Sequence, residues 1–325
     1  MKSFEYAAPT KLDAAAALLA EQWGETEILA GGTDLVTSLK QHITAPKRVV
    51  SLRNISALKG IKIQNKVARV GAMTTLSELA AHSGIKENFP ALVTAVKSIG
   101  SPQIISVGTV GGDLCQRPRC WYYRNGFGLF GKQGDASLVK DGDNRYHAIF
   151  GNEGPAYFVS ASSLGPALTA LGATIKVAGP NKSTRSIAAK DFFRTPKAEN
   201  ERETALRPNE IVTDIEIPVR GLKNATYEVR HRYGLDWPYV TATVAFESKG
   251  GAASNASVVL GHVAPTPWPS AGASGALSGR VDAALAARCG EAAAQGAKPL
   301  SGNGYKVQLV KVAVKRAILA AAGIA

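Results

Sequence analysis

The chain has 325 residues, 45% of them hydrophobic, which is enough to build about two or three globular domains. Lysine and arginine outnumber aspartate and glutamate by 38 to 25, and the formal charge of +13 suits an acidic partner, a nucleic acid or a polyanionic cofactor. The basic residues are dispersed rather than clustered with aromatic residues, which disfavours nucleic-acid binding. No apolar run approaches the roughly 18 residues of a membrane span, and three cysteines are too few for a disulfide framework.

The N-terminal residues predict a compact β-α-β-like unit. Leucine and alanine recur at helical spacing over residues 12–23, so we expect a surface helix there. Residues 28–35 indicate a short apolar strand that runs into a glycine turn, with a helical segment following to about His42. After Pro46, residues 48–52 predict a second strand.

The remaining elements follow the same kinds of pattern. Strands are expected at 61–63 and 68–72, then a helix opened by the Thr75 turn and a helix over 91–99 that ends at Gly100. Nearer the C-terminus, residues 240–246 and 257–261 predict two strands that pair with each other. Alanine-rich helices complete the chain, and the final one, over 307–319, has an apolar face.

Two glycine-rich segments, residues 28–35 and 106–114, share the same chemistry of small residues, a threonine, a glycine pair and an acid. Adjacent glycines let the main chain approach a ligand closely, and the bare N–H groups of such a turn suit a phosphate. Either segment alone is equally well explained as an ordinary glycine turn, whereas together they favour a clasp around one diphosphate. Their spacing fits neither the Rossmann fingerprint nor the P-loop.

Five separated motifs carry a resemblance to a known family. They are residues 29–35 (LAGGTDL), 70–75 (VGAMTT), 107–114 (VGTVGGDL), 168–173 (LTALGA) and 206–212 (LRPNEIV), with 215–218 (IEIP) close behind. In order and approximate spacing they resemble the FAD-binding (medium) subunit of the molybdenum hydroxylases, the group of xanthine dehydrogenase, aldehyde oxidoreductase and carbon monoxide dehydrogenase. The resemblance covers nearly the whole chain and is specific, because the motifs agree in order.

The resemblance implies an α+β fold. Its FAD-binding part has two lobes of the vanillyl-alcohol-oxidase-like type, with the cofactor in the cleft between them, and an α+β domain of the CO dehydrogenase flavoprotein type follows. Transferred to this chain, the domains are residues 1–58 and 59–220 for the two lobes, with an insertion at about 115–157, and residues 221–325 for the C-terminal domain.

The resemblance also implies which residues bind FAD. The first glycine segment would wrap the diphosphate through its backbone amides: Ile28, Leu29, Ala30, Gly31, Gly32, Thr33, Asp34 and Leu35. Gly108, Thr109, Gly112 and Asp113 would close on it from the second lobe, with Thr109 supplying a hydroxyl. Ile99, Ile211 and Val212 are expected as apolar contacts, and Asp236 and Trp237 as neighbours of the flavin, although ordinary core and turn roles explain these five residues as well.

The chain departs from the family pattern at two positions. Ser163 stands where relatives often have an acid, so a contact to the adenosine end would here be a hydroxyl. Glu228 stands where many relatives have a lysine, so a basic group near the flavin would come from Arg230 or Arg232.

The insertion resembles one that holds a [4Fe–4S] cluster in some relatives, which use four cysteines for it. Here Cys120 is in place and Cys115 is near, but the other positions are Leu129, Phe130, Ala136, Ser137 and Ala156. We therefore expect neither a [4Fe–4S] cluster nor any other metal in this chain. His147 could join the two cysteines as a metal ligand, but such a loop is a poor zinc site, and contact with a partner or shielding of the cofactor is favoured.

The resemblance implies a subunit whose FAD takes electrons from [2Fe–2S] centres and passes them to an external acceptor. Molybdopterin and the [2Fe–2S] centres would lie in a large and a small partner subunit, and we find no pattern of catalytic side chains in this chain. The competing interpretations are a flavin- or nucleotide-binding scaffold without turnover and a stand-alone FAD oxidase. We expect a cytoplasmic location, or a periplasmic one by export with a partner. The substrate, the acceptor and the stoichiometry are left open.

Overall fold

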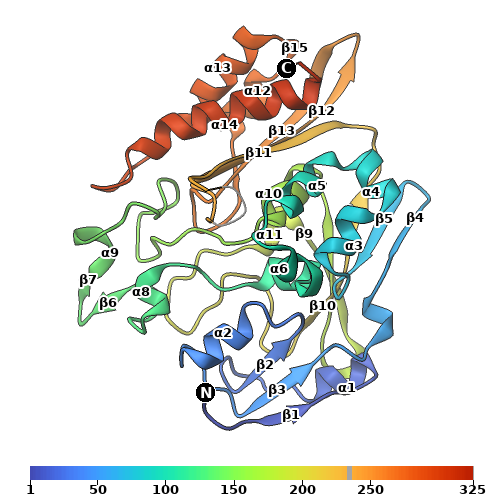
Figure 1. Ribbon diagram of the computed structural model, residues 1–325, viewed down its shortest axis with the longest axis vertical. Coiled ribbons are helices and arrows are strands. Elements are labelled where there is room, and N and C mark those ends of the chain that lie inside the picture. The colour runs from blue at the N-terminus through green and yellow to red at the C-terminus, as the bar shows by residue number, and fades with distance from the viewer. Residues whose placement is uncertain (233–235, 325) are drawn as a thin grey trace.

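The computed structural model describes residues 1–232 and 236–324. In the described residues, three larger β-sheets follow one another along the chain with helices packed on each of them, and a two-stranded sheet lies in the insertion (Figure 1). The N-terminal lobe lies at one end of the molecule, the C-terminal sheet with its long helices lies at the other, and the second lobe lies between them (Figure 1). The predicted α+β class is therefore confirmed.

The N-terminal lobe is a three-stranded parallel sheet with the strand order β1-β3-β2. Its elements are β1 Glu5–Ala7, α1 Leu12–Ala17, β2 Thr26–Leu29, α2 Leu35–Lys40 and β3 Arg48–Ser51. The predicted β-α-β unit is confirmed as β2, α2 and β3, whereas β1 was not predicted. Helix α1 is shorter than expected because the Thr26 hydroxyl accepts a hydrogen bond from the Ala20 amide at 2.9 Å, which draws the chain out of the helix.

The second lobe is built on an antiparallel sheet with the order β4-β5-β10-β8-β9. Its strands are β4 Ile61–Gln64, β5 Val67–Gly71, β8 Thr174–Ala178, β9 Thr184–Ala188 and β10 Ile211–Pro218. Its helices are α3 Leu76–Ala81, α4 Ser83–Asn88, α5 Pro90–Lys97, α6 Pro102–Val107, α7 Val110–Cys115, α10 Leu164–Ala170 and α11 Ala189–Phe192. The helix start predicted at Thr75 is confirmed, because the Thr75 hydroxyl and Glu78 form a capping box.

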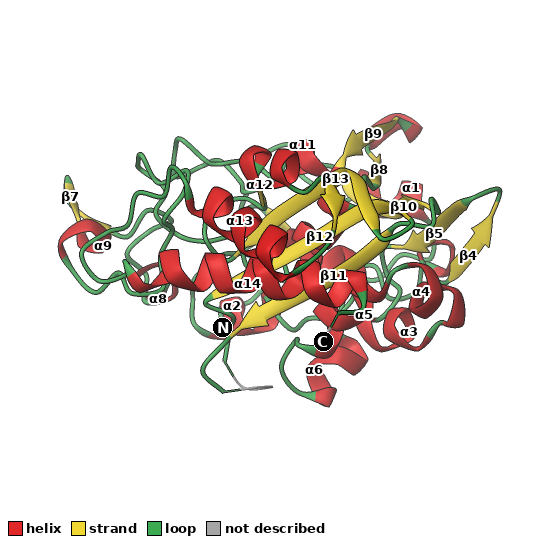
Figure 2. Ribbon diagram, turned by 90° about the horizontal axis from the view of Figure 1, so that it is seen from above, coloured by secondary structure: helices red, strands yellow, loops and turns green. Residues whose placement is uncertain are grey.

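The C-terminal part is a second antiparallel sheet with two long helices on one face (Figures 1 and 2). Its strands are β11 Lys223–Val229, β12 Val240–Lys249, β13 Ala252–Gly261, β14 Trp268–Pro269 and β15 Gly279–Arg280, and its helices are α12 Ala271–Ala276, α13 Ala283–Ala294 and α14 Tyr305–Ala322. The expected pairing of β12 with β13 is confirmed. The apolar face expected on the last helix is also confirmed, since Val310, Val314 and Ile318 are fully buried.

The insertion lies to one side of the three sheets and contains only short elements (Figure 1). These are α8 Trp121–Arg124, β6 Lys132–Gln133, β7 Ala136–Ser137 and α9 Leu138–Asp141. The insertion is joined to the C-terminal part by Lys306, whose buried ammonium donates to the backbone carbonyls of Tyr146 and His147 at 3.0 Å and of His262 at 2.9 Å.

The domain boundaries expected near residues 58 and 220 lie in connections between sheets. Ala245 and Val259 of the C-terminal sheet nevertheless pack into the hydrophobic core of the second lobe, so the division into domains stays a prediction. Within residues 1–232 and 236–324, no helix combines the length and the apolar character needed to cross a membrane.

Candidate functional site

The two glycine segments meet face to face at Gly31. A Cβ atom built on Gly31 would lie 2.0 Å from the carbonyl oxygen of Val107 and 3.1 Å from the Cα of Gly108, so only glycine permits this approach. Gly32 has a positive φ of 83°, which turns the chain from β2 toward α2. In the described part of the chain, the N–H groups of residues 31–34 donate no hydrogen bond, so this turn presents bare amides.

The second glycine segment is not a turn between strands but the junction of α6 and α7. Its amides are mostly used inside the protein: Val110 N–H donates to the Thr74 carbonyl at 3.0 Å, and Gly111 N–H donates to the Ala72 carbonyl at 2.8 Å. Thr109 caps α7 by accepting the Gly112 N–H at 3.1 Å, which leaves its hydroxyl proton free to donate. This segment therefore offers a hydroxyl and a close backbone surface, whereas the first segment offers amides.

Two cavities, of about 580 and 240 Å³, meet at this junction. The walls common to both are Thr33, Asp34, Thr109, Gly112 and Gln116. The glycine segments thus form the waist of one elongated cleft with a chamber on each side. The N-terminal lobe and the second lobe both line the larger chamber, and residues after β11 close the smaller one.

Most of the residues predicted to contact a cofactor line this cleft. The predicted residues that line the larger chamber are Ile28, Ala30, Gly31, Gly32, Thr33, Asp34, Leu35, Thr109, Gly112, Ile211 and Val212. The smaller chamber takes Ile99, Gly108, Asp113, Ser163, Asp236 and Trp237, in addition to the four predicted residues at the waist. Of the predicted set, Leu29 and Arg230 line neither chamber. The cofactor contacts themselves stay predictions.

The carboxylate of Asp113 is engaged within the protein. It accepts hydrogen bonds from Ser162 Oγ at 2.6 Å and from the Leu164 N–H at 3.0 Å, and thereby holds the start of α10. Burial raises the pKa of this carboxyl group, and the bond from Ser162 opposes the shift. We infer that Asp113 shapes the wall of the smaller chamber and that its carboxylate is occupied by these internal bonds.

The carboxylate of Asp34 is turned toward the insertion. It accepts the Arg117 N–H at 2.8 Å and forms ion pairs with Arg119 at 3.1 Å and Arg124 at 2.9 Å. Two guanidinium groups therefore neutralise the charge of this acid beside the bare amides. Asp34 fastens the insertion to the first glycine turn.

The guanidinium groups of Arg230 and Arg232, one of which was expected near the flavin, form ion pairs and hydrogen bonds within the protein. Arg230 forms an ion pair with Glu228 and donates to the Ser98 carbonyl at 2.6 Å, while Arg232 pairs with the Asp236 carboxylate at 2.9 Å. Both arginines are thus held by acids on the same stretch of chain.

Ser163 lies in the smaller chamber with Asp236 and Trp237, and not with Ile211 and Val212 in the larger one. The contact of Ser163 with the adenosine end and the contact of Trp237 with the flavin were predicted separately, yet the structure groups these two residues. Which end of a cofactor Ser163 contacts stays a prediction.

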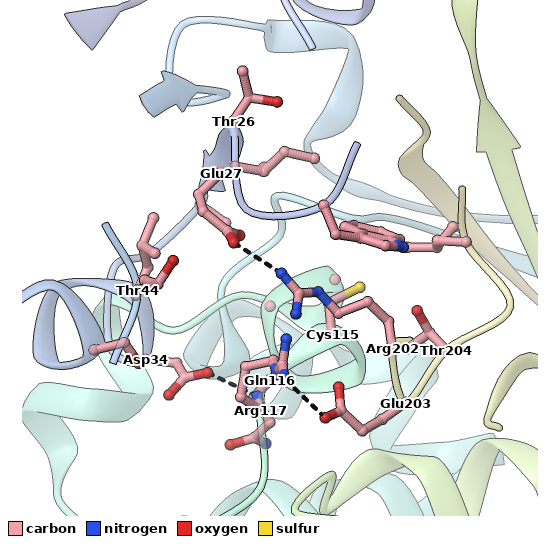
Figure 3. A pocket seen from close by; sticks show the side chains of 18 of the residues that line it. Thr26, Glu27, Asp34, Thr44, Cys115, Gln116, Arg117, Arg202, Glu203 and Thr204 are labelled. Atoms are coloured by element: carbon pink, nitrogen blue, oxygen red, sulfur yellow. Dashed lines mark hydrogen bonds and ion pairs between the residues drawn. The ribbon is translucent and has the colours of Figure 1, made fainter. Parts of the chain in front are cut away.

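Sequence reasoning missed a set of ion pairs in the larger chamber (Figure 3). Arg117 Nη2 lies 3.2 Å from Glu203 Oε1, and Arg202 Nη2 lies 3.2 Å from Glu27 Oε1. The Arg202 guanidinium also lies over the ring of Trp23, 4.9 Å from its centroid. These residues come from β2, the insertion and the irregular segment before β10, and no motif connects them in the sequence.

The insertion does not bring its two cysteines together. Cys120 Sγ lies 3.1 Å from His147 Nε2, whereas Cys115 is at the end of α7 and lines the larger chamber. Among the described residues, no three histidine, cysteine or acidic side chains converge as metal ligands would. Leu129, Phe130 and Ala156, which stand at positions where the cluster-bearing relatives have cysteines, pack into a small hydrophobic core.

Two buried histidines predict a pH-dependent stability. Burial and the nearby charge of Lys306 lower the pKa of His147 to about 4 and that of His262 to about 3. An unfolded histidine has a pKa of about 6.5, so between pH 6.5 and 4 the unfolded chain binds protons that the folded chain does not. Stability should fall as the pH drops through this window, by on the order of 2 kcal/mol per histidine from pH 7 to pH 4.5.

Urea unfolding at a series of pH values would measure this effect. His147→Gln should flatten the pH dependence, and His231→Gln, which makes the same chemical change at an exposed position, is the matched control. Equal stability at pH 7 and pH 4.5 in the unmodified protein would contradict the prediction.

Two sequence families match the chain end to end. The family described as "FAD binding domain in molybdopterin dehydrogenase" matches residues 2–220, and the one described as "CO dehydrogenase flavoprotein C-terminal domain" matches residues 225–321. The chain belongs to the FAD-binding subunits of molybdenum hydroxylases. The aldehyde oxidoreductase FAD-binding subunit of Escherichia coli is 28% identical over 314 residues, 96% of each chain. The carbon monoxide dehydrogenase medium chain of Hydrogenophaga pseudoflava is 27% identical over 324 residues, 98% of this chain and 96% of that protein.

Solved structures agree with this membership. The quinoline 2-oxidoreductase structure from Pseudomonas putida 86 matches with a TM-score of 0.77 and 26% identity, covering 100% of this chain and 99% of that chain. The carbon monoxide dehydrogenase structure from Hydrogenophaga pseudoflava matches with a TM-score of 0.76 and 25% identity, covering 99% of this chain and 98% of that chain. Like its relatives, the chain is a flavoprotein subunit of an oxidoreductase.

The cleft fits the FAD of this family. The bare amides of residues 31–34 suit the two negative charges of a diphosphate, and the missing side chain of Gly31 lets the second segment approach them. The waist lies between two chambers, as a diphosphate lies between the two ends of FAD. The residues that would hold it are the first glycine turn, through its amides, and Thr109, through its hydroxyl.

Proposed function

We propose that this chain is the electron-transfer subunit of a multi-subunit molybdenum hydroxylase. Its FAD would collect electrons from [2Fe–2S] centres in a small partner subunit and pass them to an external acceptor, while the substrate is oxidised at molybdopterin in a large partner subunit. The observation that carries the proposal is the cleft with bare amides at its waist, in a chain whose relatives are FAD subunits of oxidoreductases.

The chain's own residues would position the cofactor. We place the adenosine end in the larger chamber and the flavin ring in the smaller one, because a ring that exchanges electrons needs an approach from outside. The smaller chamber also contains Asp236 and Trp237, the two residues that the family resemblance places beside the flavin. We also propose that the exposed positive charge of the chain contributes to binding acidic partner surfaces.

The visible spectrum of the purified chain tests the proposal. A flavin band is expected in the blue region, together with molybdenum and iron–sulfur subunits that co-purify with the chain. A folded and colourless protein would sink the proposal and favour a scaffold, whereas a flavin-loaded chain that turns over without partners would favour a stand-alone oxidase.

Glycine substitutions test where the diphosphate binds. We expect Gly32→Val and Gly112→Val to lose flavin, because valine disfavours the φ of 83° at Gly32, and a Cβ at Gly112 lies 2.9 Å from Thr109 Oγ1. Gly275→Ala is the control, since Gly275 is in helix α12 and a Cβ there meets nothing within 4 Å. Flavin content per protein, read from the absorbance spectrum, is the measurement, and parental content in both valine variants would refute the placement.

A further inference from the structure

The larger chamber contains a buried carboxylate that its ion pair does not satisfy. Glu203 is only 8% exposed, and its Oε1 has no hydrogen-bond partner among the described residues, although Arg117 Nη2 lies 3.2 Å away. The Nε of Arg117 is likewise buried and without a partner. Burial raises the pKa of the Glu203 carboxyl, and the Arg117 charge opposes the shift.

The position of Glu203 is fixed by its surroundings. Its carbonyl accepts the Arg194 N–H at 2.9 Å, and Thr204 forms an isolated β-bridge with Phe193, so the backbone is held on both sides. Its carboxylate points into the chamber beside Arg117 (Figure 3). Glu27 is different, because it accepts a hydrogen bond from Arg202 at 3.2 Å.

The chemistry of this wall selects the kind of ligand group. A carboxylate accepts hydrogen bonds and repels phosphate, so the part of the Glu203 carboxylate that lines the chamber calls for a donor such as a hydroxyl or an amine. A metal cation is disfavoured by the guanidinium groups of Arg117 and Arg202. The same chamber is also lined by Leu52, Met73 and Ile211, which belong to one hydrophobic cluster and suit the flat faces of an aromatic base.

We propose that Glu203, positioned by Arg117, recognises the ribose hydroxyls at the adenosine end of the dinucleotide. Glu203 lines the same chamber as the glycine turn and is connected to it through Arg117, whose backbone N–H donates to Asp34 at 2.8 Å. A carboxylate that accepts from a ribose diol is a common solution in nucleotide-binding proteins. This inference rests on the proposed function, since it takes FAD as the ligand of the cleft.

Nucleotides that lack the hydroxyls provide the test. The full chain is stripped of flavin, and the affinities for FAD, ADP and 2′,3′-dideoxy-ADP are measured by calorimetry. For the unmodified protein we expect ADP to bind about 10- to 100-fold more tightly than the dideoxy nucleotide, as lost hydrogen bonds to a charged group imply. In Glu203→Gln this ratio should fall to about threefold or less, because a neutral amide is a weaker acceptor.

Control variants separate recognition from folding. Glu216→Gln makes the same chemical change at an ion pair with Lys176 on the second sheet, outside the cleft, and should keep the parental ratio. If Glu203→Gln does not fold, Glu203→Asp replaces it in the test. Aspartate keeps the charge beside Arg117 but is one methylene shorter, so the ratio of ADP affinity to dideoxy-ADP affinity should lie between those expected for the parent and for the glutamine variant.

The outcomes distinguish the two proposals. If the parent protein binds FAD but does not discriminate between ADP and its dideoxy form, or binds no ADP, the role of Glu203 is wrong and the proposed function stands. If the ratio of the ADP and dideoxy-ADP affinities is the same in Glu203→Gln as in the parent, the role of Glu203 is likewise wrong and the proposed function stands. If the parent protein binds no FAD, both proposals fail.

Discussion

Gly31→Ala is expected to abolish flavin binding, with a loss of affinity of at least about 100-fold. The Cβ of alanine would lie 2.0 Å from the carbonyl oxygen and 2.8 Å from the carbonyl carbon of Val107. Both atoms belong to the backbone, so no side chain can rotate away, and the two glycine segments would have to separate. Because the diphosphate site is formed by their contact, the bare amides and the Thr109 hydroxyl would no longer face the same ligand.

The measurement is the ratio of flavin to protein after purification, together with the free energy of unfolding in urea. Forcing a methyl group into packed structure costs about 1–3 kcal/mol, so we expect the variant to fold with reduced stability. Gly304→Ala adds the same methyl group at the N-cap of α14, where nothing lies within 4 Å, and should keep its flavin. Full flavin content in Gly31→Ala would show that the diphosphate does not bind between these segments.

Asp34→Asn is expected to release the insertion from the first glycine turn. The change leaves the guanidinium groups of Arg119 and Arg124 without their carboxylate, and it replaces a charged acceptor of the Arg117 N–H by a neutral one. Removing one partner of a fully buried ion pair costs about 3–5 kcal/mol. Since the side chains of this cluster are 12% to 25% exposed, we expect a loss of about 2–3 kcal/mol.

Two measurements follow this release. Urea unfolding gives the stability, and limited trypsin digestion should cut the variant after Arg119 or Arg124 under conditions that leave the parent intact. Asp214→Asn is the matched control, because Asp214 forms an ion pair with Arg69 at 2.8 Å on the sheet of the second lobe. Asp214→Asn should lose less stability than Asp34→Asn and should keep the insertion protected from trypsin. If trypsin digests Asp34→Asn and the parent equally, the proposed anchoring of the insertion by Asp34 is wrong.

The sequence predicted the parts of the fold that depend on local pattern. The strands β2 and β3, the capping box at Thr75 and the pairing of β12 with β13 all follow from hydrophobic periodicity and turn residues. Sequence patterns predicted the local structure less well where a contact with a distant residue determines it. Beyond the end of helix α1, the Thr26 hydroxyl accepts a hydrogen bond from the Ala20 amide. In the second glycine segment, Thr109 caps helix α7, and Gly111 lies so close to Ala72 that a side chain would not fit.

For the candidate site too, the sequence predicts what depends on a local motif, and the tertiary structure decides what depends on contacts between distant residues. The sequence by itself determined the family and the two glycine segments, and most of the contact residues that it predicted do line the cleft, because small residues at a close backbone approach leave a recognisable motif. Only the tertiary structure decided what the charged side chains do. Asp34 faces the insertion, Asp113 holds helix α10, and Arg117 meets Glu203 across 86 positions of the chain. An ion pair depends on where two side chains meet in space, and a single sequence does not record that distance.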